Sequence, residues 1–260
     1  MDPTRVVRSG AAVLVCVTVL AAAACRPGGS TGQAADPAPT RPGASATPSA
    51  SASSALAGLS GRQVAGRSLA AMRHLHSVKV RVDIEDRGRR TRATVAAARN
   101  GCRIHASMPG LGTVTYMHVG RATVVRLGEK AARAVAGRPG AALLVGRYLK
   151  VGDDPAFADL ATMCRARAFT KELADESAGV SFTRVGTATV AGATAVVLTV
   201  KGSGDRSRLY VAASGSPYLL KAVGHLRDYS GTVTFGDFDR VPPVHLPPAR
   251  KTIDVTKPHG

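Results

Sequence analysis

Residues 78–85 read Val-Lys-Val-Arg-Val-Asp-Ile-Glu, and this stretch decides the fold class. Apolar side chains alternate with charged ones at every position, which predicts a β-strand with one face on a core and the other in water. Similar short stretches recur along the chain, separated by turn sequences such as Arg87-Gly88, Asn100-Gly101 and Ala191-Gly192. The sequence therefore predicts a domain built mostly from antiparallel strands.

A helix is expected directly before this first strand. Ser60 and Gln63 have the spacing of a capping box, which marks a helix start. Apolar residues then follow at helical intervals at Ala65, Leu69, Met72 and Leu75. The helix should end near Ser77, where the hydrophobic period changes to two.

The remaining elements are expected in three groups. Strands are predicted at 90–97, 102–107, 113–119, 122–127, 147–151, 181–190, 193–201, 208–213, 218–225 and 231–235. Short helices are predicted in the middle of the chain, at Glu129–Ala136, from Asp154 with Pro155 at its first position, and at Arg167–Glu176. Ten or eleven strands with a few helices between them favour an α+β fold, in which one large curved antiparallel sheet carries helices on its concave face.

Residues 1–24 have the pattern of a secretion signal. Arg5 and Arg8 give it a basic start, and Ala11–Ala24 carries no charge. This run is shorter than the roughly 20 residues that a transmembrane helix needs. Its end, LAAAAC at residues 20–25, resembles the lipobox of bacterial lipoproteins. That resemblance implies a lipid anchor on Cys25, which would hold the protein at the extracytoplasmic face of the cell membrane.

Two alternatives to the lipid anchor stay open at this point. Ala22 stands three residues before Cys25, where the lipobox usually has leucine. Ordinary cleavage after an Ala-x-Ala sequence, or a retained signal anchor, would also fit the pattern. Cys16 lies inside the apolar run and is expected to be filler.

Residues 25–55 are expected to form the lipidated cysteine and a disordered tether. Ala, Ser, Pro, Gly and Thr make up nearly all of this segment. Such a composition cannot bury enough apolar surface to offset the entropy of ordering. The tether would separate the membrane from a single domain, residues 56–260, which is long enough for one sizeable core.

Cys102 and Cys164 are the two cysteines of the predicted domain. Export would place them in an oxidising compartment, where a disulfide is expected to form. Such a bond would tie a strand to the helix packed on it. Two unpaired buried thiols are the alternative.

The chain is strongly basic, with 35 Lys and Arg against 17 Asp and Glu and a formal net charge of +18. Such a field favours anionic partners, among them lipid headgroups and wall polymers. Nucleic acid is not expected as a partner, because the basic residues are scattered, aromatic residues make up only 4% and no nucleic-acid-binding motif stands out. The alternative to a dedicated anion site is a solvated surface rich in arginine.

No motif in the chain predicts catalysis. The nucleophile elbow, the phosphate-binding loop and the dinucleotide fingerprint are all missing from the sequence, so neither an enzyme nor a cofactor is expected. His74 and His76, close to Met72, could suggest copper, but residues two apart on a helix point in different directions, so no metal site is expected. His118 and His225 lie in predicted strands and are expected to bond nearby backbone.

Several longer motifs resemble those of actinobacterial envelope lipoproteins of the LolA/LppX-like superfamily. The matching stretches are NGC at 100–102, GRYLKV at 146–151, LYVAASGSPYLLK at 209–221 and FGDFD at 235–239. The resemblance covers most of residues 56–248. It implies a half-open β-barrel whose mouth is plugged by helices and which encloses an apolar cavity. Members of this superfamily carry lipids or lipidated proteins across the envelope.

The inward side chains of the strands are therefore the candidate cavity lining, namely Val78, Val80, Val82, Ile84, Val114, Tyr116, Val196, Leu198 and Phe235. An ordinary packed core would show the same alternation. The leading hypothesis is a non-enzymatic lipoprotein that binds or shuttles a lipid or another apolar ligand. The alternative is a structural or sensory envelope module that binds a protein or a wall polymer.

Overall fold

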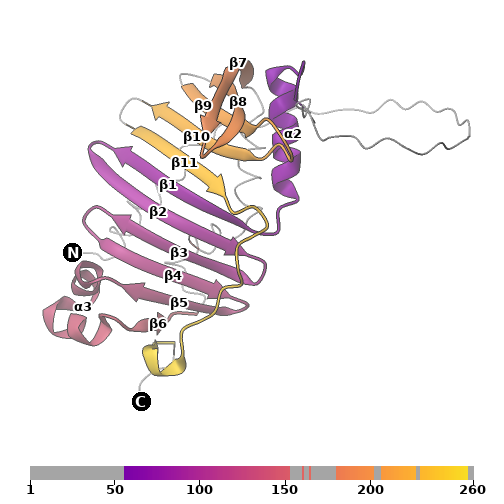
Figure 1. Cartoon of the computed structure of the whole chain (residues 1–260). Coiled ribbons are helices and arrows are strands. Elements are labelled where there is room, and N and C mark those ends of the chain that lie inside the picture. Colours follow the sequence, from indigo (N-terminus) through magenta and orange to yellow (C-terminus); the bar gives the residue numbers. More distant parts are fainter. Residues whose placement is uncertain are drawn as a thin grey trace, which may run out of the picture.

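The computed structural model describes residues 56–152, 160, 164, 180–201, 206–226 and 229–256. In this part of the chain, twelve strands form one curved, mostly antiparallel sheet whose two edge strands are not paired with each other (Figure 1). The predicted α+β fold with a half-open sheet is therefore confirmed. The signal sequence, Cys25, the tether and the helices predicted at Asp154 and at 167–176 lie outside the described residues.

The first strand of the chain lies at the centre of the sheet. Across the sheet, the strands run in the order β12 (Thr252–Asp254), β6 (Tyr148–Lys150), β5 (Ala122–Leu127), β4 (Gly112–Val119), β3 (Gly101–Met108), β2 (Arg89–Ala98), β1 (Val78–Asp86), β11 (Tyr229–Gly236), β10 (Leu219–Leu226), β9 (Arg206–Ala212), β8 (Ala193–Lys201) and β7 (Ser181–Val190). Eleven of these were predicted, and β12, which pairs in parallel with β6, was missed. Pairing of β1 with β11 joins the two halves of the chain into one sheet.

The alternation in β1 divides the sheet into two faces. Val80 lies opposite Val95, and the same row continues through Ile104, Tyr116 and Val125 on β3, β4 and β5. All five side chains are buried, and we call this side the inner face. Lys79, Arg81 and Asp83 point to the opposite side, the outer face.

Helix α2 (Gly61–Arg73) packs on the inner face beside β7, β9 and β10. The predicted capping box is present, because Ser60 Oγ accepts from Gln63 N and Gln63 Oε1 accepts from Ser60 N. The helix buries the side that carries Val64, Ala65, Ser68 and Met72. Its end at Arg73 is a few residues earlier than the sequence predicted.

Element α3 (Glu129–Leu144) consists of two helical pieces, because Gly137 between them has a non-helical conformation with φ 67° and ψ 179°. The first piece matches the helix predicted at 129–136, and the second piece, which contains Pro139, was not predicted. Its alanines at 131, 132 and 141 are buried, whereas Val135 and Leu143 are 68% and 71% exposed. None of the helices in the described part combines the length and the apolar character that crossing a membrane requires.

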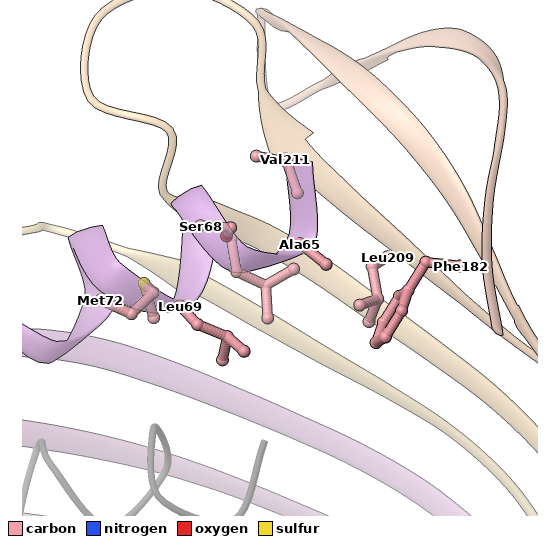
Figure 2. A pocket seen from close by; sticks show the side chains of 8 residues that line it. Ala65, Ser68, Leu69, Met72, Phe182, Leu209 and Val211 are labelled. Atoms are coloured by element: carbon pink, nitrogen blue, oxygen red, sulfur yellow. The ribbon is translucent and has the colours of Figure 1, made fainter. Parts of the chain in front are cut away.

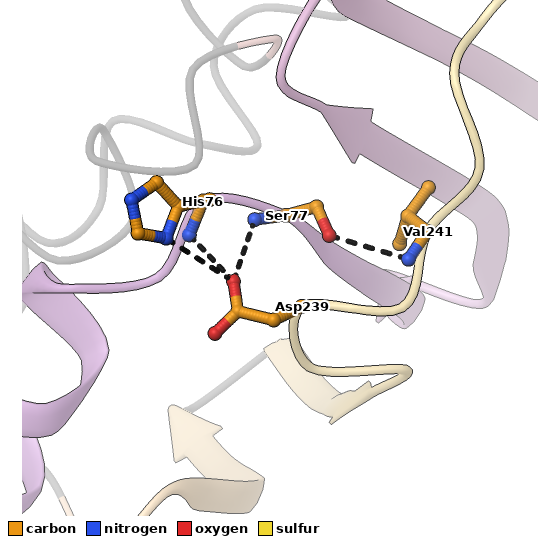
Figure 3. A network of polar contacts seen from close by, with 4 residues as sticks. All are labelled: His76, Ser77, Asp239 and Val241. Carbon is orange, nitrogen blue, oxygen red and sulfur yellow. Dashed lines mark hydrogen bonds and ion pairs between the residues drawn. The ribbon is translucent and has the colours of Figure 1, made fainter.

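Figure 3 shows how Asp239 fastens the junction between α2 and β1 to the end of β11. Asp239 Oδ1 accepts from the backbone N–H groups of His76 at 2.7 Å and of Ser77 at 3.2 Å. The Ser77 hydroxyl in turn accepts from Val241 N at 3.2 Å. Asp239 has a φ of 54°, a left-handed conformation in which aspartate is one of the more common residues. His76 is thus part of a structural junction, and no three His, Cys, Asp or Glu side chains gather into a metal-binding group among the described residues.

After β11 the chain runs along the ends of the central strands to β12 (Figure 1). Asn100 holds this segment with two hydrogen bonds, donating from Nδ2 to Val244 O at 2.8 Å and accepting from Val244 N at 3.0 Å. Val244 packs with Met117 and Val124 in a small cluster apart from the main core. The C-terminal segment therefore covers part of the outer face, which the sequence did not predict.

Candidate ligand-binding site

The nine predicted cavity residues lie together on the inner face. Eight of them are at most 8% exposed, and Phe235 is partly buried against the same cluster. The structure thus brings all nine into one continuous apolar core. None of them borders the pocket described below, and their role as a cavity wall stays a prediction.

Cys102 of β3 is joined to Cys164 by a disulfide, with the two Cα atoms 5.2 Å apart. Both cysteines are buried and belong to the inner-face cluster. The bond fastens residue 164 to the inner face, as the sequence predicted.

His118 lies beside Cys102 in the register of β3 and β4. Its Nδ1 is 3.0 Å from Thr123 Oγ1, so its partner is a side chain on the next strand. The expectation that His118 bonds backbone is therefore wrong, because the pairing of β4 with β5 brings a threonine hydroxyl within reach. The side chain of His225 lies outside the described residues.

A narrow pocket lies between α2 and the inner face (Figure 2). Its walls are Ala65, Ser68, Leu69 and Met72 from α2, and Phe182, Leu209, Val211 and Leu219 from β7, β9 and β10. Ser68 is the one residue of this set with a polar side chain. The volume is about 30 Å³, about a fifth of the roughly 150 Å³ of an apolar cavity that holds a benzene molecule. As it stands, this pocket is apolar but too small for an acyl chain.

The start of α2 is tied closely to β7. A Cβ at Gly61 would overlap the carbonyl oxygen of Phe182, so glycine permits this approach. Arg62 Nη2 donates to Val180 O at 3.3 Å, and Arg184 Nη1 donates to Leu56 O at 2.9 Å. Since the Asp239 junction holds the other end, enlargement of the pocket depends on movement of side chains rather than on release of the helix.

Carboxylates neutralise some of the cations on the outer face. Arg90 donates to both oxygens of Asp83, at 2.6 and 2.5 Å, and this bonding lowers the pKa of Asp83. Lys150 Nζ lies 3.0 Å from Asp254 Oδ2. Hydrogen bonds from Thr256 and then Lys150 lower the pKa of Asp254 to about 2. Both carboxylates therefore stay ionised near neutral pH.

Among the described residues, other cations of the outer face have no carboxylate partner. Within the described ranges, no carboxylate lies within ion-pair distance of Arg81, Arg103, Arg126, Arg208 and Lys221. Two of these cations lie over aromatic rings, Arg126 at 5.3 Å from the centre of Tyr148 and Lys221 at 5.5 Å from that of Tyr210. The excess positive charge of the chain is thus concentrated in part on this face.

Comparison with known proteins identifies the fold. No family model matches the chain, and no curated protein is significantly similar to it in sequence. Among solved structures, LprF from Mycobacterium bovis is 16% identical, and its match covers 72% of this chain and 96% of LprF with a TM-score of 0.50. This chain has the LprF fold.

Two further solved structures are similar over most of their length. The lipoprotein LppX from Mycobacterium tuberculosis is 16% identical, with 72% of this chain and 99% of LppX covered at a TM-score of 0.46. A LolA superfamily protein from Nitrosomonas europaea is 11% identical, with 69% and 92% covered at a TM-score of 0.25. The match to LprF supports the curved, half-open sheet that the resemblance implies, and membership of the LolA/LppX-like superfamily stays a prediction.

Proposed function

We propose that this chain is a membrane-anchored extracytoplasmic protein that binds a lipid or another apolar ligand between α2 and the inner face of its sheet. The observation that carries this proposal is the apolar pocket, which lies on the same face as the main core cluster. An acyl chain gains about 0.8 kcal/mol for each CH₂ that it buries on such a surface. The resemblance of the sequence motifs to those of lipid-carrying proteins supports the same function.

Binding requires the pocket to grow from its volume of about 30 Å³. Leu69 and Met72 are the long α2 side chains in its wall. Methionine adapts to irregular spaces because it is unbranched and has three rotatable bonds. We expect an acyl chain to enter by displacing these two side chains while both ends of α2 stay fastened.

The substitution Ala65→Phe tests this site. Ala65 is 5% exposed and lines the pocket, so a phenyl ring there should occupy the space that an acyl chain opens by displacing Leu69 and Met72, and should lower uptake of a fluorescent fatty acid by about tenfold or more. Ala70→Phe is the matched control, because it also replaces an alanine of α2 by phenylalanine. Ala70 lies on the exposed side of this helix. Uptake by the unmutated protein should be visible in parallel as bound lipid in native mass spectrometry of detergent-free material.

Two results would contradict apolar ligand binding here. One is equal uptake by the Ala65→Phe and Ala70→Phe variants when both have the melting temperature of the unmutated protein. The other is a complete lack of uptake by the unmutated chain. Either result would favour the alternative, a module that binds a protein or a wall polymer.

The anchor is a separate part of the proposal and is supported by the sequence of residues 1–25. We expect Cys25→Ala to release the protein from the membrane fraction or to block its maturation, because two or three acyl chains are needed for stable anchoring. Cell fractionation and the intact mass of the chain measure this. Cys16→Ala, in the same apolar run, is the control and should change neither. A native chain that carries no acyl mass would rule out the lipobox interpretation.

A further inference from the structure

The outer face carries a second hollow, on the opposite side of the sheet from the core cluster. It has a volume of about 190 Å³ and lies where β3, β4 and β5 meet the residues that follow α3. Its lining residues are His105, Thr113, Thr115, Arg126, Leu127, Gly128, Val145 and Gly146. Several of these are hydrogen-bond donors, which distinguishes this hollow from the apolar pocket under α2.

The register of the sheet brings three of the polar side chains together. His105 lies opposite Thr115, and Thr115 lies opposite Arg126, so the three residues form one row across β3, β4 and β5. His105 Nδ1 is 3.1 Å from Thr115 Oγ1. Either the imidazole or the hydroxyl donates in this bond, and the other group then keeps an N–H or O–H for a ligand.

Arg126 supplies the positive charge. Its guanidinium lies over the ring of Tyr148, which faces it from the neighbouring strand, at 5.3 Å from the ring centre. Apart from this ring contact, Arg126 forms no ion pair with the described residues. A planar guanidinium fork held in this way matches the geometry of an oxyanion.

No acid lines this hollow to compete with a ligand. Glu129 follows Gly128 directly but is paired with Arg133. Lys150 and Asp254, on β6 and β12, are paired with each other. The local charge among the described residues is therefore positive, and the Arg126 guanidinium and one N–H or O–H of the His105–Thr115 pair stay available to a ligand. This combination favours a small anion over a cation.

We propose that this hollow binds a phosphate-type oxyanion, with Arg126 as the main ligand and with His105 and Thr115 completing the site. Such a group occurs both as free phosphate and as the headgroup of a phospholipid. Val145 at the rim is 44% exposed, and Leu143 on the same segment is 71% exposed. A phospholipid would place its acyl chains against these two side chains. This site is independent of the apolar site under α2.

Titration calorimetry on the full chain tests the site with inorganic phosphate as the probe. Arg126→Gln should weaken phosphate binding by about tenfold or more, because it removes a charge-assisted hydrogen-bond donor. Thr115→Val keeps the shape of a buried side chain and should weaken binding by about threefold or more. Arg103→Gln is the matched control, since Arg103 is an exposed arginine of the outer face that does not line the hollow. It removes the same charge and should leave the affinity unchanged.

Dihexanoyl phosphatidic acid, a soluble short-chain phospholipid, separates the two sources of phosphate. Tighter binding of this lipid than of phosphate, lost in Val145→Ser, would identify a phospholipid headgroup site, whereas equal binding would identify a site for free phosphate. Two results would overturn the proposal: no saturable binding of either probe, or equal weakening by Arg126→Gln and Arg103→Gln. If Arg126→Gln lowers the melting temperature, the phosphate affinity of Thr115→Val tests the site in its place.

Discussion

Removal of the disulfide between Cys102 and Cys164 is expected to lower the free energy of unfolding by about 4 kcal/mol. The two cysteines are 62 positions apart in the sequence, so the bond closes a long loop and restricts the unfolded chain strongly. Denaturant unfolding of the double variant Cys102→Ala/Cys164→Ala measures the loss. The same change should lower the melting temperature by several degrees.

Reduction of the unmutated protein with dithiothreitol provides an independent measurement of the same quantity. Because the disulfide leaves no free thiol on Cys102 or Cys164, a thiol reagent should label neither of them in the oxidised protein, whether it is native or unfolded in denaturant. Rapid labelling of both residues under native conditions would contradict the disulfide. If the reduced protein and the Cys102→Ala/Cys164→Ala variant have the same free energy of unfolding, the whole loss of stability is due to this one bond.

The sequence predicted most of the sheet because its signals are local. Alternation over Val78–Glu85 fixes which side chains share a face, and the Ser60–Gln63 capping box fixes the start of α2. One feature required long-range information. Thr252–Asp254 is too short for a visible period and becomes a strand only because β6 offers an edge. In α3, by contrast, the local signal held, because the helix predicted at 129–136 ends at the break that Gly137 and Pro139 mark.

The same distinction explains which parts of the candidate sites could be predicted. The alternation of apolar and polar residues along each strand was enough to place the nine inward residues on one face. The pocket under α2 also depends on where the helix lies over the sheet, which no local pattern encodes. The outer hollow depends on register, because His105, Thr115 and Arg126 become neighbours only when three strands pair at specific positions.

Tyr116→Ala is expected to lower the free energy of unfolding by about 3–5 kcal/mol, which is typical for removal of a fully buried aromatic ring. Tyr116 is 1% exposed and is among the largest fully buried side chains in the described part of the chain. It lies on the inner face between Ile104 and Val125. Truncation would leave a cavity among these neighbours, because a packed sheet relaxes only in part. Denaturant unfolding of the variant measures the loss.

Tyr116→Phe is the matched control, since it keeps the ring and removes only the hydroxyl. A much smaller loss in this variant would assign the effect of Tyr116→Ala to packing of the ring.

Tyr116→Ala also distinguishes the two interpretations of the inner face, a packed core and a cavity open to ligands. In a packed core, Tyr116→Ala should be strongly destabilising and should create new space for a fluorescent fatty acid. If Tyr116 instead lines a cavity that is open to ligands, its removal should cost less than about 1 kcal/mol, because few close contacts would be lost. A small loss would therefore overturn the packed core and restore the nine inward residues as a cavity wall.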